Sequence, residues 1–280
     1  MRDVAACRVL LFTPGNRPDR FPKAAATEAD GVILDLEDAV SVPDKDKARA
    51  TLIEFLGTKP DGNFGLRVNN VHTPAGVRDL DALVSSGVRP GFVMLPKVES
   101  AFEARLYARL LGDVPLVCTV ESAGGLEAAT EIANADPRVR ALAFGGADLA
   151  VDLRAALAWE PMYWGRGRIA QAAATAGIAA IDVPHVVLDD EAGLRSDAVR
   201  VKAMGFSAKL AIHPKQLAPL LEIFTPTAEE IEGARALVAA YRAAGGNVLE
   251  YQGKMVEGPI VRSAERILLL ADRAGKPVAG

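Results

Sequence analysis

The sequence predicts a (β/α)8 barrel, in which eight parallel strands close into a ring inside a layer of helices, followed by a helical extension. Short apolar runs alternate with helix-forming segments, an order typical of a parallel sheet. About eight such units recur at intervals of roughly 30 residues, and this regularity favours a closed barrel over the alternative, an open doubly wound sheet. No low-complexity linker divides the chain.

The predicted strands are apolar runs bounded by Gly, Pro or polar residues. Because they are apolar almost throughout, they are typical of strands that are buried on both faces. We expect strands at residues 8–14, 31–37, 64–69, 92–98, 115–121, 141–146, 178–183 and 208–212.

The predicted helices follow the strands and are rich in good helix formers such as Ala, Leu, Glu and Arg. Ser100 and Glu103 have the spacing of a capping box at one helix start. We expect a barrel at 1–225 and a helical extension at 226–280 that packs on a neighbouring subunit. Gly245 and Gly246 resemble a hinge, after which the tail could pack away from the barrel. We expect helices at residues 24–29, 44–56, 76–86, 101–111, 126–134, 166–175, 191–204, 214–224, 227–244 and 263–273.

The composition excludes several classes of protein. A formal net charge of -4 argues against nonspecific nucleic-acid binding, which needs a concentrated basic surface. No apolar run approaches the ~20 residues of a membrane helix, and the N-terminus lacks the apolar region of a signal peptide. Cys7 and Cys118 match no metal spacing and are expected to be reduced core residues. We therefore expect a cytoplasmic protein.

Charged and polar residues gather where the predicted strands end. In barrels of this type the C-terminal ends of the strands carry the active site. Some of these residues could instead form salt bridges between strands or cap helices. The residues are Asn16, Arg17, Arg20, Asp35, Glu37, Asp38, Arg67, Asn69, Lys97, Glu99, Glu121, Asp148, Asp182, His185, Lys209 and His213.

Glu121 and Asp148 follow neighbouring strands, so their carboxylates could converge. Such hard oxygen ligands suit Mg²⁺, which commonly takes one or two carboxylates and leaves its other positions to water and substrate. Gly145 and Gly146 would let the backbone approach the metal or a bound ligand closely. The alternative is that Glu121 caps the next helix and Asp148 is an ordinary loop acid. No zinc-ligand spacing, Ser-His-Asp set or Walker motif is visible.

Eight short motifs occur in the order seen in a known family. They are LFTPGNRPDR at 11–20, ILDLEDAV at 33–40, LRVN at 66–69, MLPKV at 94–98, ESA at 121–123, FGGADL at 144–149, AIHP at 211–214 and GKMVEGP at 253–259. Together they cover essentially the whole chain. The sequence resembles the citrate lyase β-subunit-like family of the HpcH/HpaI aldolase/citrate lyase superfamily.

The resemblance implies a TIM barrel that binds Mg²⁺ and an acyl-CoA and cleaves or forms a carbon–carbon bond. Expected substrates are malyl-, citramalyl- or citryl-CoA, which give a 2-oxo acid and an acyl-CoA. Glu121 and Asp148 match the family's metal ligands, and Arg67 matches its substrate-binding arginine. Arg17 and Arg20, with the nearby Lys23, would contact CoA phosphates. Homotrimers or hexamers are implied, with the C-terminal segment reaching over a neighbouring active site.

The acids after residue 34 and the tail motif complete the expected site. Asp35, Glu37 and Asp38 would support the metal waters or Arg67. The family's tail motif usually carries Met-x-Asp, whose Asp is a candidate proton-transfer group. Here the position is Glu257, which keeps the carboxylate but adds a methylene. A displacement near 1 Å can cost about a hundredfold in rate, so Glu257 is either a shifted catalytic group or no longer catalytic.

Two other functions fit the same resemblance. One is a CoA-independent aldolase acting on free 2-oxo acids, although such relatives usually carry a catalytic His near the first strands and none precedes His72 here. The other is a non-catalytic acyl-CoA-binding subunit of a larger complex. A carrier-protein thioester could also replace CoA.

Overall fold

The computed structural model describes residues 3–60 and 62–275, which form two compact units. Unit 1 is Met1–Leu221 and unit 2 is Glu222–Gly280. The division falls within helix α9 (Leu217–Phe224), whereas the predicted boundary followed residue 225.

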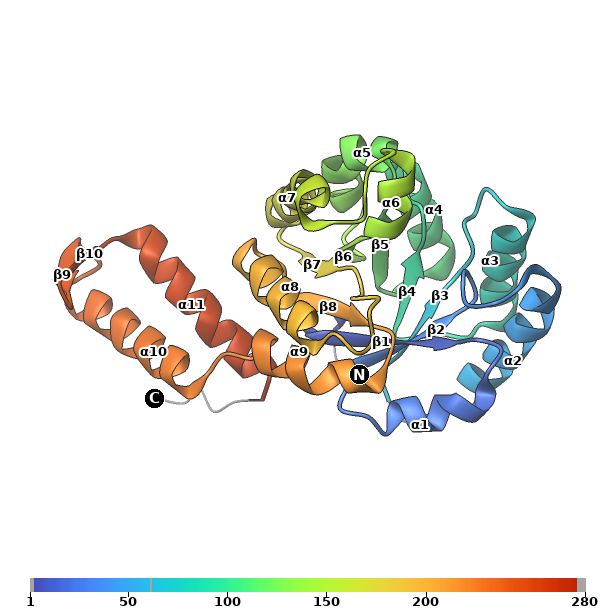
Figure 1. Cartoon of the computed structure of the whole chain (residues 1–280), viewed down its shortest axis with the longest axis horizontal. Helices are drawn as coiled ribbons and strands as arrows, with labels where there is room; N and C mark the ends of the chain where they lie inside the picture. Colours follow the sequence, from blue (N-terminus) through green and yellow to red (C-terminus); the bar gives the residue numbers. More distant parts are fainter. Residues whose placement is uncertain (1–2, 61, 276–280) are drawn as a thin grey trace. The chain divides into compact units, whose positions relative to one another are not determined.

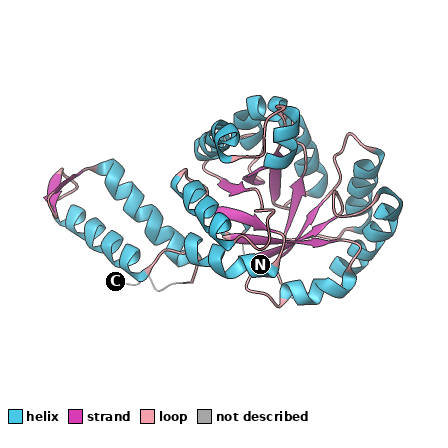
Figure 2. Cartoon of the chain, viewed as in Figure 1, coloured by secondary structure: helices cyan, strands magenta, loops and turns pink. Residues whose placement is uncertain are grey.

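Unit 1 is a closed barrel of eight parallel strands in chain order, so the predicted fold is confirmed (Figures 1 and 2). Leu10 of the first strand pairs with Leu210 of the last and closes the ring. The polar ends of several predicted runs lie just beyond the paired segment. The strands are β1 (Val9–Pro14), β2 (Gly31–Asp35), β3 (Phe64–Arg67), β4 (Phe92–Leu95), β5 (Leu116–Val120), β6 (Val139–Phe144), β7 (Ala179–Asp182) and β8 (Ala208–Ala211).

The barrel interior is filled by apolar side chains at alternate strand positions. At the start of the chain, Val4 in the 3₁₀-helix η1 (Val4–Ala6) and Cys7 pack against this cluster. They precede β1, so they close the end where the strands begin. Strand members of the cluster are Leu10, Ile33, Phe92, Met94, Val117, Ala141, Ala143, Ala179, Ile181, Ala208 and Leu210. Cys7 and Cys118 are both buried in the core, as expected.

Helices surround the barrel, and most agree with prediction (Figure 2). Ser100 and Glu103 form the predicted capping box. The α6 helix, which contains Asp148, was not predicted. The α7 helix begins before the predicted residue 166; the prediction missed its first turns because they contain aromatic residues and Gly, which are poor helix signals. The helices are α1 (Phe21–Ala25), α2 (Lys45–Gly57), α3 (Pro74–Ser86), α4 (Ala101–Leu111), α5 (Ala123–Ala133), α6 (Gly146–Asp152), α7 (Trp159–Ala176) and α8 (Glu191–Ala203), then α9, with 3₁₀-helices η2 (Pro18–Arg20), η3 (Val42–Asp44) and η4 (Pro214–Gln216). Among the described residues, no helix is both long and apolar enough to span a bilayer.

Unit 2 is a helical hairpin with a small antiparallel β-hairpin between its helices. Its elements are α10 (Ala228–Ala243), β9 (Leu249–Tyr251), β10 (Lys254–Val256) and α11 (Gly258–Arg273). The two helices lie side by side (Figure 1) and bury a core that includes Val238, Val256 and Val261. Gly245 and Gly246 have φ of 70° and 76° and follow α10 inside this unit. These glycines thus lie between α10 and the β-hairpin, and the expected packing of the tail on a neighbouring subunit stays a prediction.

Two of the polar residues expected at the active face instead lie between the barrel and its helices. Asp182 and Lys209 are register partners on β7 and β8. Their neighbours Ile181 and Leu210 occupy the interior, so these two side chains point outward. The Lys209 ammonium donates to Asp182, and Arg166 Nε donates to the other Asp182 oxygen at 2.8 Å. All three residues are buried, so the alternative of an inter-strand salt bridge holds here.

Asn69 and His185 are likewise held away from the expected site. Asn69 donates its backbone and side-chain N–H groups to Asp79 at 2.7 and 2.6 Å. His185 Nδ1 lies 3.0 Å from Asp197. Both residues follow their strands, where the chain has already turned toward the helices.

Candidate active site

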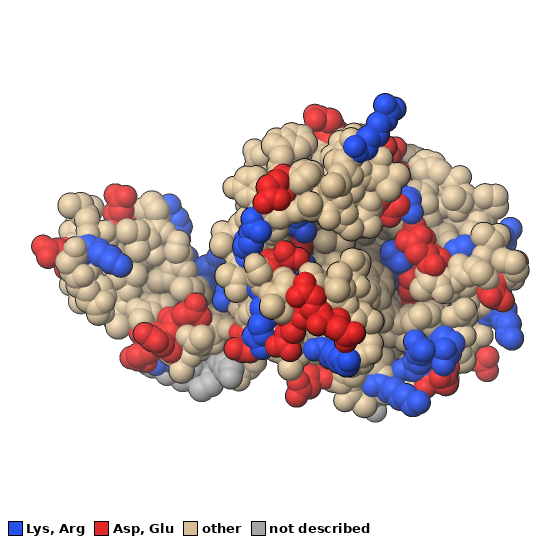
Figure 3. Space-filling model, in the orientation of Figure 1, with Lys and Arg blue, Asp and Glu red and all other residues tan. Residues whose placement is uncertain are grey.

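A cavity of about 930 Å³ opens at the C-terminal ends of the barrel strands. Figure 3 shows a hollow on this face of unit 1 with acidic and basic side chains at its rim. Phe12, Met94 and Leu210 give it an apolar lining, while Arg67 and Glu121 contribute charge. This is the end of the barrel that the sequence predicted, and it combines an apolar wall with few polar groups, as small-molecule sites do.

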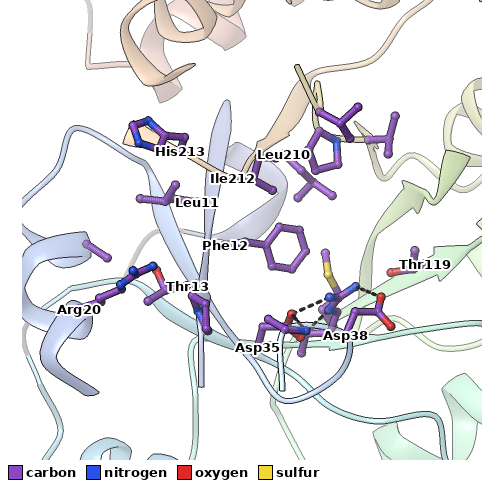
Figure 4. A pocket seen from close by; sticks show the side chains of 18 of the residues that line it. Leu11, Phe12, Thr13, Arg20, Asp35, Asp38, Thr119, Leu210, Ile212 and His213 are labelled. Carbon is purple, nitrogen blue, oxygen red and sulfur yellow. Dashed lines mark hydrogen bonds and ion pairs between the residues drawn. The ribbon is translucent and has the colours of Figure 1, made fainter. Parts of the chain in front are cut away.

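Arg67, at the end of β3, is held in one position by acids from β2 and the loop after it. Two of these acids, Asp35 and Asp38, are labelled in Figure 4. Asp35 is the register partner of Arg67 and accepts two hydrogen bonds from it, from Nε at 2.7 Å and from Nη2 at 2.6 Å. The guanidinium also lies 4.7 Å from the centre of the Phe12 ring. Burial lowers the pKa of Arg67, but hydrogen bonds and charge from Asp35 outweigh it and leave the pKa raised. Arg67 is thus a fixed positive charge in the cavity wall.

Asp35 and Glu37 are buried because they are almost fully paired. Asp35 also accepts the backbone N–H groups of Glu37 and Ala39, at 2.9 and 3.2 Å, which turns the chain away from β2. Glu37 Oε1 accepts a hydrogen bond from Lys97 Nζ at 2.8 Å. Its Oε2 is 2.9 Å from Arg67 Nη1, yet this buried atom receives no hydrogen bond. Asp38 is exposed and lies 3.5 Å from Arg67.

Glu121 follows β5 and is 6% exposed. Its Oε1 accepts the backbone N–H of Lys97 at 2.7 Å. Burial, then the negative charges of Glu37 and Asp148, raises the pKa of Glu121 to about 8. The largest cause is burial, and the neighbouring carboxylates add to it. Glu121 does not cap α5, whose N-cap is the Ser122 side chain.

Asp148 approaches the same point from the first turn of α6. Its Oδ1 is 3.8 Å from Lys97 Nζ, the ammonium that also binds Glu37. Gly145, just before α6, makes room for Glu121, because a Cβ there would lie 2.3 Å from Glu121 Oε2. Glu121 and Asp148 therefore line the same cavity, and their role as metal ligands stays a prediction.

These residues fit a hard divalent cation. Among the described residues, no group of three or more His, Cys, Asp or Glu side chains is arranged to hold a metal. The protein would supply only the two carboxylates of Glu121 and Asp148, which is the number that Mg²⁺ commonly takes. The negative charges of Glu37 and Asp148 contribute to the raised pKa of Glu121, and a divalent cation would offset them.

The other predicted site residues are two arginines of the cavity lining and one glutamate of unit 2. Arg17 and Arg20 line the cavity with Lys23, and all three are exposed. Arg17 pairs with Asp19 at 2.9 Å, so part of its charge is engaged on the surface. Figure 4 labels Arg20, from η2, and Asp35, from β2, among the residues that line the cavity. Glu257 is exposed at the N-cap of α11 and belongs to unit 2.

The role of Lys97 was not predicted, although the residue was among the polar strand ends. Its backbone has φ of 52°, which no sequence pattern indicated. Thr119 and Phe144 also line the cavity. The sequence indicated this only through their positions near the ends of β5 and β6.

Gly145→Ala is expected to weaken Mg²⁺ binding at least about tenfold, because the new methyl group displaces the Glu121 carboxylate. Gly167→Ala is the matched control, since a Cβ at that position of α7 meets no atom within 4 Å. Isothermal titration of both variants with Mg²⁺ measures the difference. Equal affinities in the two variants would show that Glu121 is not a ligand or tolerates displacement.

Comparison with known proteins identifies relatives along nearly the whole chain. Residues 8–214 match the family described as HpcH/HpaI aldolase/citrate lyase. The chain is 34% identical to citrate lyase subunit beta of Leuconostoc mesenteroides subsp. cremoris, over 95% of this chain and 93% of that protein. It is 35% identical to L-malyl-CoA/beta-methylmalyl-CoA lyase of Cereibacter sphaeroides, over 95% of this chain and 94% of that one.

A solved structure agrees in fold as well as in sequence. The CitE protein of Mycobacterium tuberculosis, in complex with magnesium, acetoacetate and coenzyme A, matches 96% of this chain and 100% of its own. The TM-score is 0.81 and the sequence identity is 34%. The resemblance seen in the eight motifs is thus confirmed, and the chain belongs to the HpcH/HpaI aldolase/citrate lyase family of carbon–carbon lyases.

Proposed function

We propose that this protein is a Mg²⁺-dependent lyase that cleaves, or forms, a β-hydroxyacyl-CoA such as malyl-, citramalyl- or citryl-CoA. The products of cleavage are a 2-oxo acid and an acyl-CoA. The observation that carries the proposal is that Glu121, Asp148 and the fixed guanidinium of Arg67 line one cavity. The CitE complex with magnesium and coenzyme A supports it, because that protein is similar over nearly its whole length.

Each charged group of the cavity then has a defined role. Glu121 and Asp148 would hold Mg²⁺, which supplies Lewis-acid chemistry at the hydroxyl and carboxylate of the substrate. Arg67 places a permanent positive charge where the thioester enolate develops negative charge. Asp35 and Glu37 keep that guanidinium in place, as partners that orient a catalytic group usually do.

The outer residues would bind the carrier part of the substrate. Arg17, Arg20 and Lys23 are exposed cations at the cavity rim and suit the phosphates of CoA. Glu257 would move a proton at the site of a neighbouring copy, in a homotrimer or hexamer whose extensions cover adjacent barrels.

The test is a panel of malyl-, citramalyl- and citryl-CoA with the purified chain and Mg²⁺. Release of a 2-oxo acid from at least one thioester, abolished by EDTA, is expected. The same acids without CoA are the control, because a CoA-independent aldolase would cleave them equally well. No cleavage of any thioester by the isolated chain would refute the proposal and favour a non-catalytic subunit.

Mg²⁺ binding is expected to depend on pH because of the raised pKa of Glu121. The folded protein holds the Glu121 proton more tightly than the unfolded chain does. The protonated carboxyl therefore stabilises the folded state at low pH, and this stabilisation is lost as pH rises toward about 8. The metal needs the carboxylate, so its apparent affinity should rise about tenfold per pH unit below that pKa and then level off. Isothermal titration between about pH 6 and pH 9 measures this slope. A flat profile below pH 8 would contradict the assignment of Glu121 as a ligand.

A further inference from the structure

Lys97 has an unusual backbone at an unusual place. It is one of four non-glycine residues with positive φ among those the structure describes, the others being Lys59, Arg154 and Gln252. Those three are exposed and lie in loops or turns, whereas Lys97 is partly buried and its backbone bonds Glu121, a residue of the cavity wall. Left-handed conformations of L-residues are strained and tend to occur at functional sites, where the surrounding structure holds them.

The strained conformation aims the Lys97 backbone at a predicted metal ligand. Its N–H donates to Glu121 Oε1 at 2.7 Å, and its carbonyl oxygen accepts from Asn70 Nδ2 at 3.2 Å. The next residue, Val98, donates to the Thr119 carbonyl at 3.0 Å, so the chain rejoins β5 at once. Lys97 therefore bulges between two anchored points, and the bulge fixes one oxygen of the Glu121 carboxylate.

The Lys97 side chain lies among the remaining acids of the site. Nζ is 2.8 Å from Glu37 Oε1, 3.8 Å from Asp148 Oδ1 and 4.0 Å from Asp38 Oδ1. A single ammonium thus lies close to three carboxylates, one of which is a predicted metal ligand. Because a divalent cation at Glu121 and Asp148 would meet the same negative charge, the ammonium and the metal compete for it.

We propose that Lys97 is a positioning residue with two roles, one for its backbone and one for its side chain. The proposal rests on the proposed function only in that it requires a divalent cation at Glu121 and Asp148. Its backbone N–H orients the Glu121 carboxylate. Its ammonium is an internal counter-cation that holds Glu37 and Asp148 together in the metal-free protein and withdraws when the divalent cation binds. The side chain therefore weakens metal binding while it preserves the arrangement of the ligands.

Lys97→Ala and Lys97→Gly form the test, because both remove the ammonium but only glycine adopts positive φ without strain. With Mg²⁺ alone and no substrate, isothermal titration should show both variants binding about tenfold more tightly than the parent, since a competing charge is gone. Lys97→Arg, which keeps the charge, should bind like the parent. Unchanged or weaker binding in both the Ala and Gly variants would overturn the counter-cation role.

Thermal unfolding of the metal-free proteins tests the backbone role separately. The Gly variant should melt at least about 2 °C above the Ala variant, because the left-handed conformation costs alanine more. Equal melting temperatures would overturn the claim that the conformation is imposed. Failure of the parent protein itself to bind Mg²⁺ would refute the proposed cation site and with it this role, whereas normal binding by the parent with no gain in the variants refutes the Lys97 proposal alone.

Discussion

Glu121→Gln is expected to lower the Mg²⁺-dependent lyase rate by about a thousandfold or more while the barrel stays folded. The amide has the shape of the carboxylate and can still accept the Lys97 N–H, so the local structure is retained. It removes the negative charge that would bind the metal. Loss of one group that stabilises the transition state commonly costs up to about 10³ in rate, and we expect at least that for a metal ligand.

Two measurements separate this result from general damage. Mg²⁺ should no longer raise the melting temperature of the variant, since a ligand that binds only the folded state stabilises it in proportion to its affinity. Glu131→Gln on α5 is the matched control, because Glu131 is exposed and away from the cavity. A Glu121→Gln enzyme with most of its Mg²⁺-dependent activity would exclude Glu121 as a required ligand.

Arg67→Lys is expected to reduce kcat by about a hundredfold although the charge is retained. Lysine cannot make the parallel pair of hydrogen bonds that Arg67 gives to Asp35, so the positive charge loses its fixed position. The buried Asp35 also loses a partner, which should reduce the free energy of unfolding by about 1–3 kcal/mol.

Steady-state kinetics and urea unfolding measure these two effects. Arg78→Lys is the control, because Arg78 is exposed and pairs with Asp46 at the surface. That substitution should change neither quantity by much. If Arg67→Lys lowered stability and left kcat unchanged, the residue would be structural rather than catalytic.

The barrel was predictable because its strands are continuous apolar runs at regular intervals. The pairing of Asp35 with Arg67 also follows from the sequence, since both end neighbouring strands and carry opposite charge. The direction in which each side chain points was harder to predict from the sequence. Where both faces of a strand are apolar, the sequence does not show which face is interior, and so Asp182 and Lys209 were expected at the cavity although they point toward the helices.

Other features of the site depend on geometry that leaves no sequence pattern. The positive φ of Lys97 is set by anchors on β5 and the loop after β3, which are remote in the chain. The β9–β10 hairpin consists of two three-residue strands, too short for a periodic signal. Gly145 was predicted to let the backbone approach the metal or a bound ligand. In the structure it is the Glu121 side chain that lies against this glycine.

The most direct test of the cation site is an anomalous difference map from crystals of the protein soaked in Mn²⁺. The proposed function predicts one strong peak at roughly 2.1–2.2 Å from a carboxylate oxygen of both Glu121 and Asp148, with Asp35 and Glu37 still bound to Arg67. A peak coordinated directly by Asp35, Glu37 or Asp38 instead, or no peak in the cavity, would contradict it.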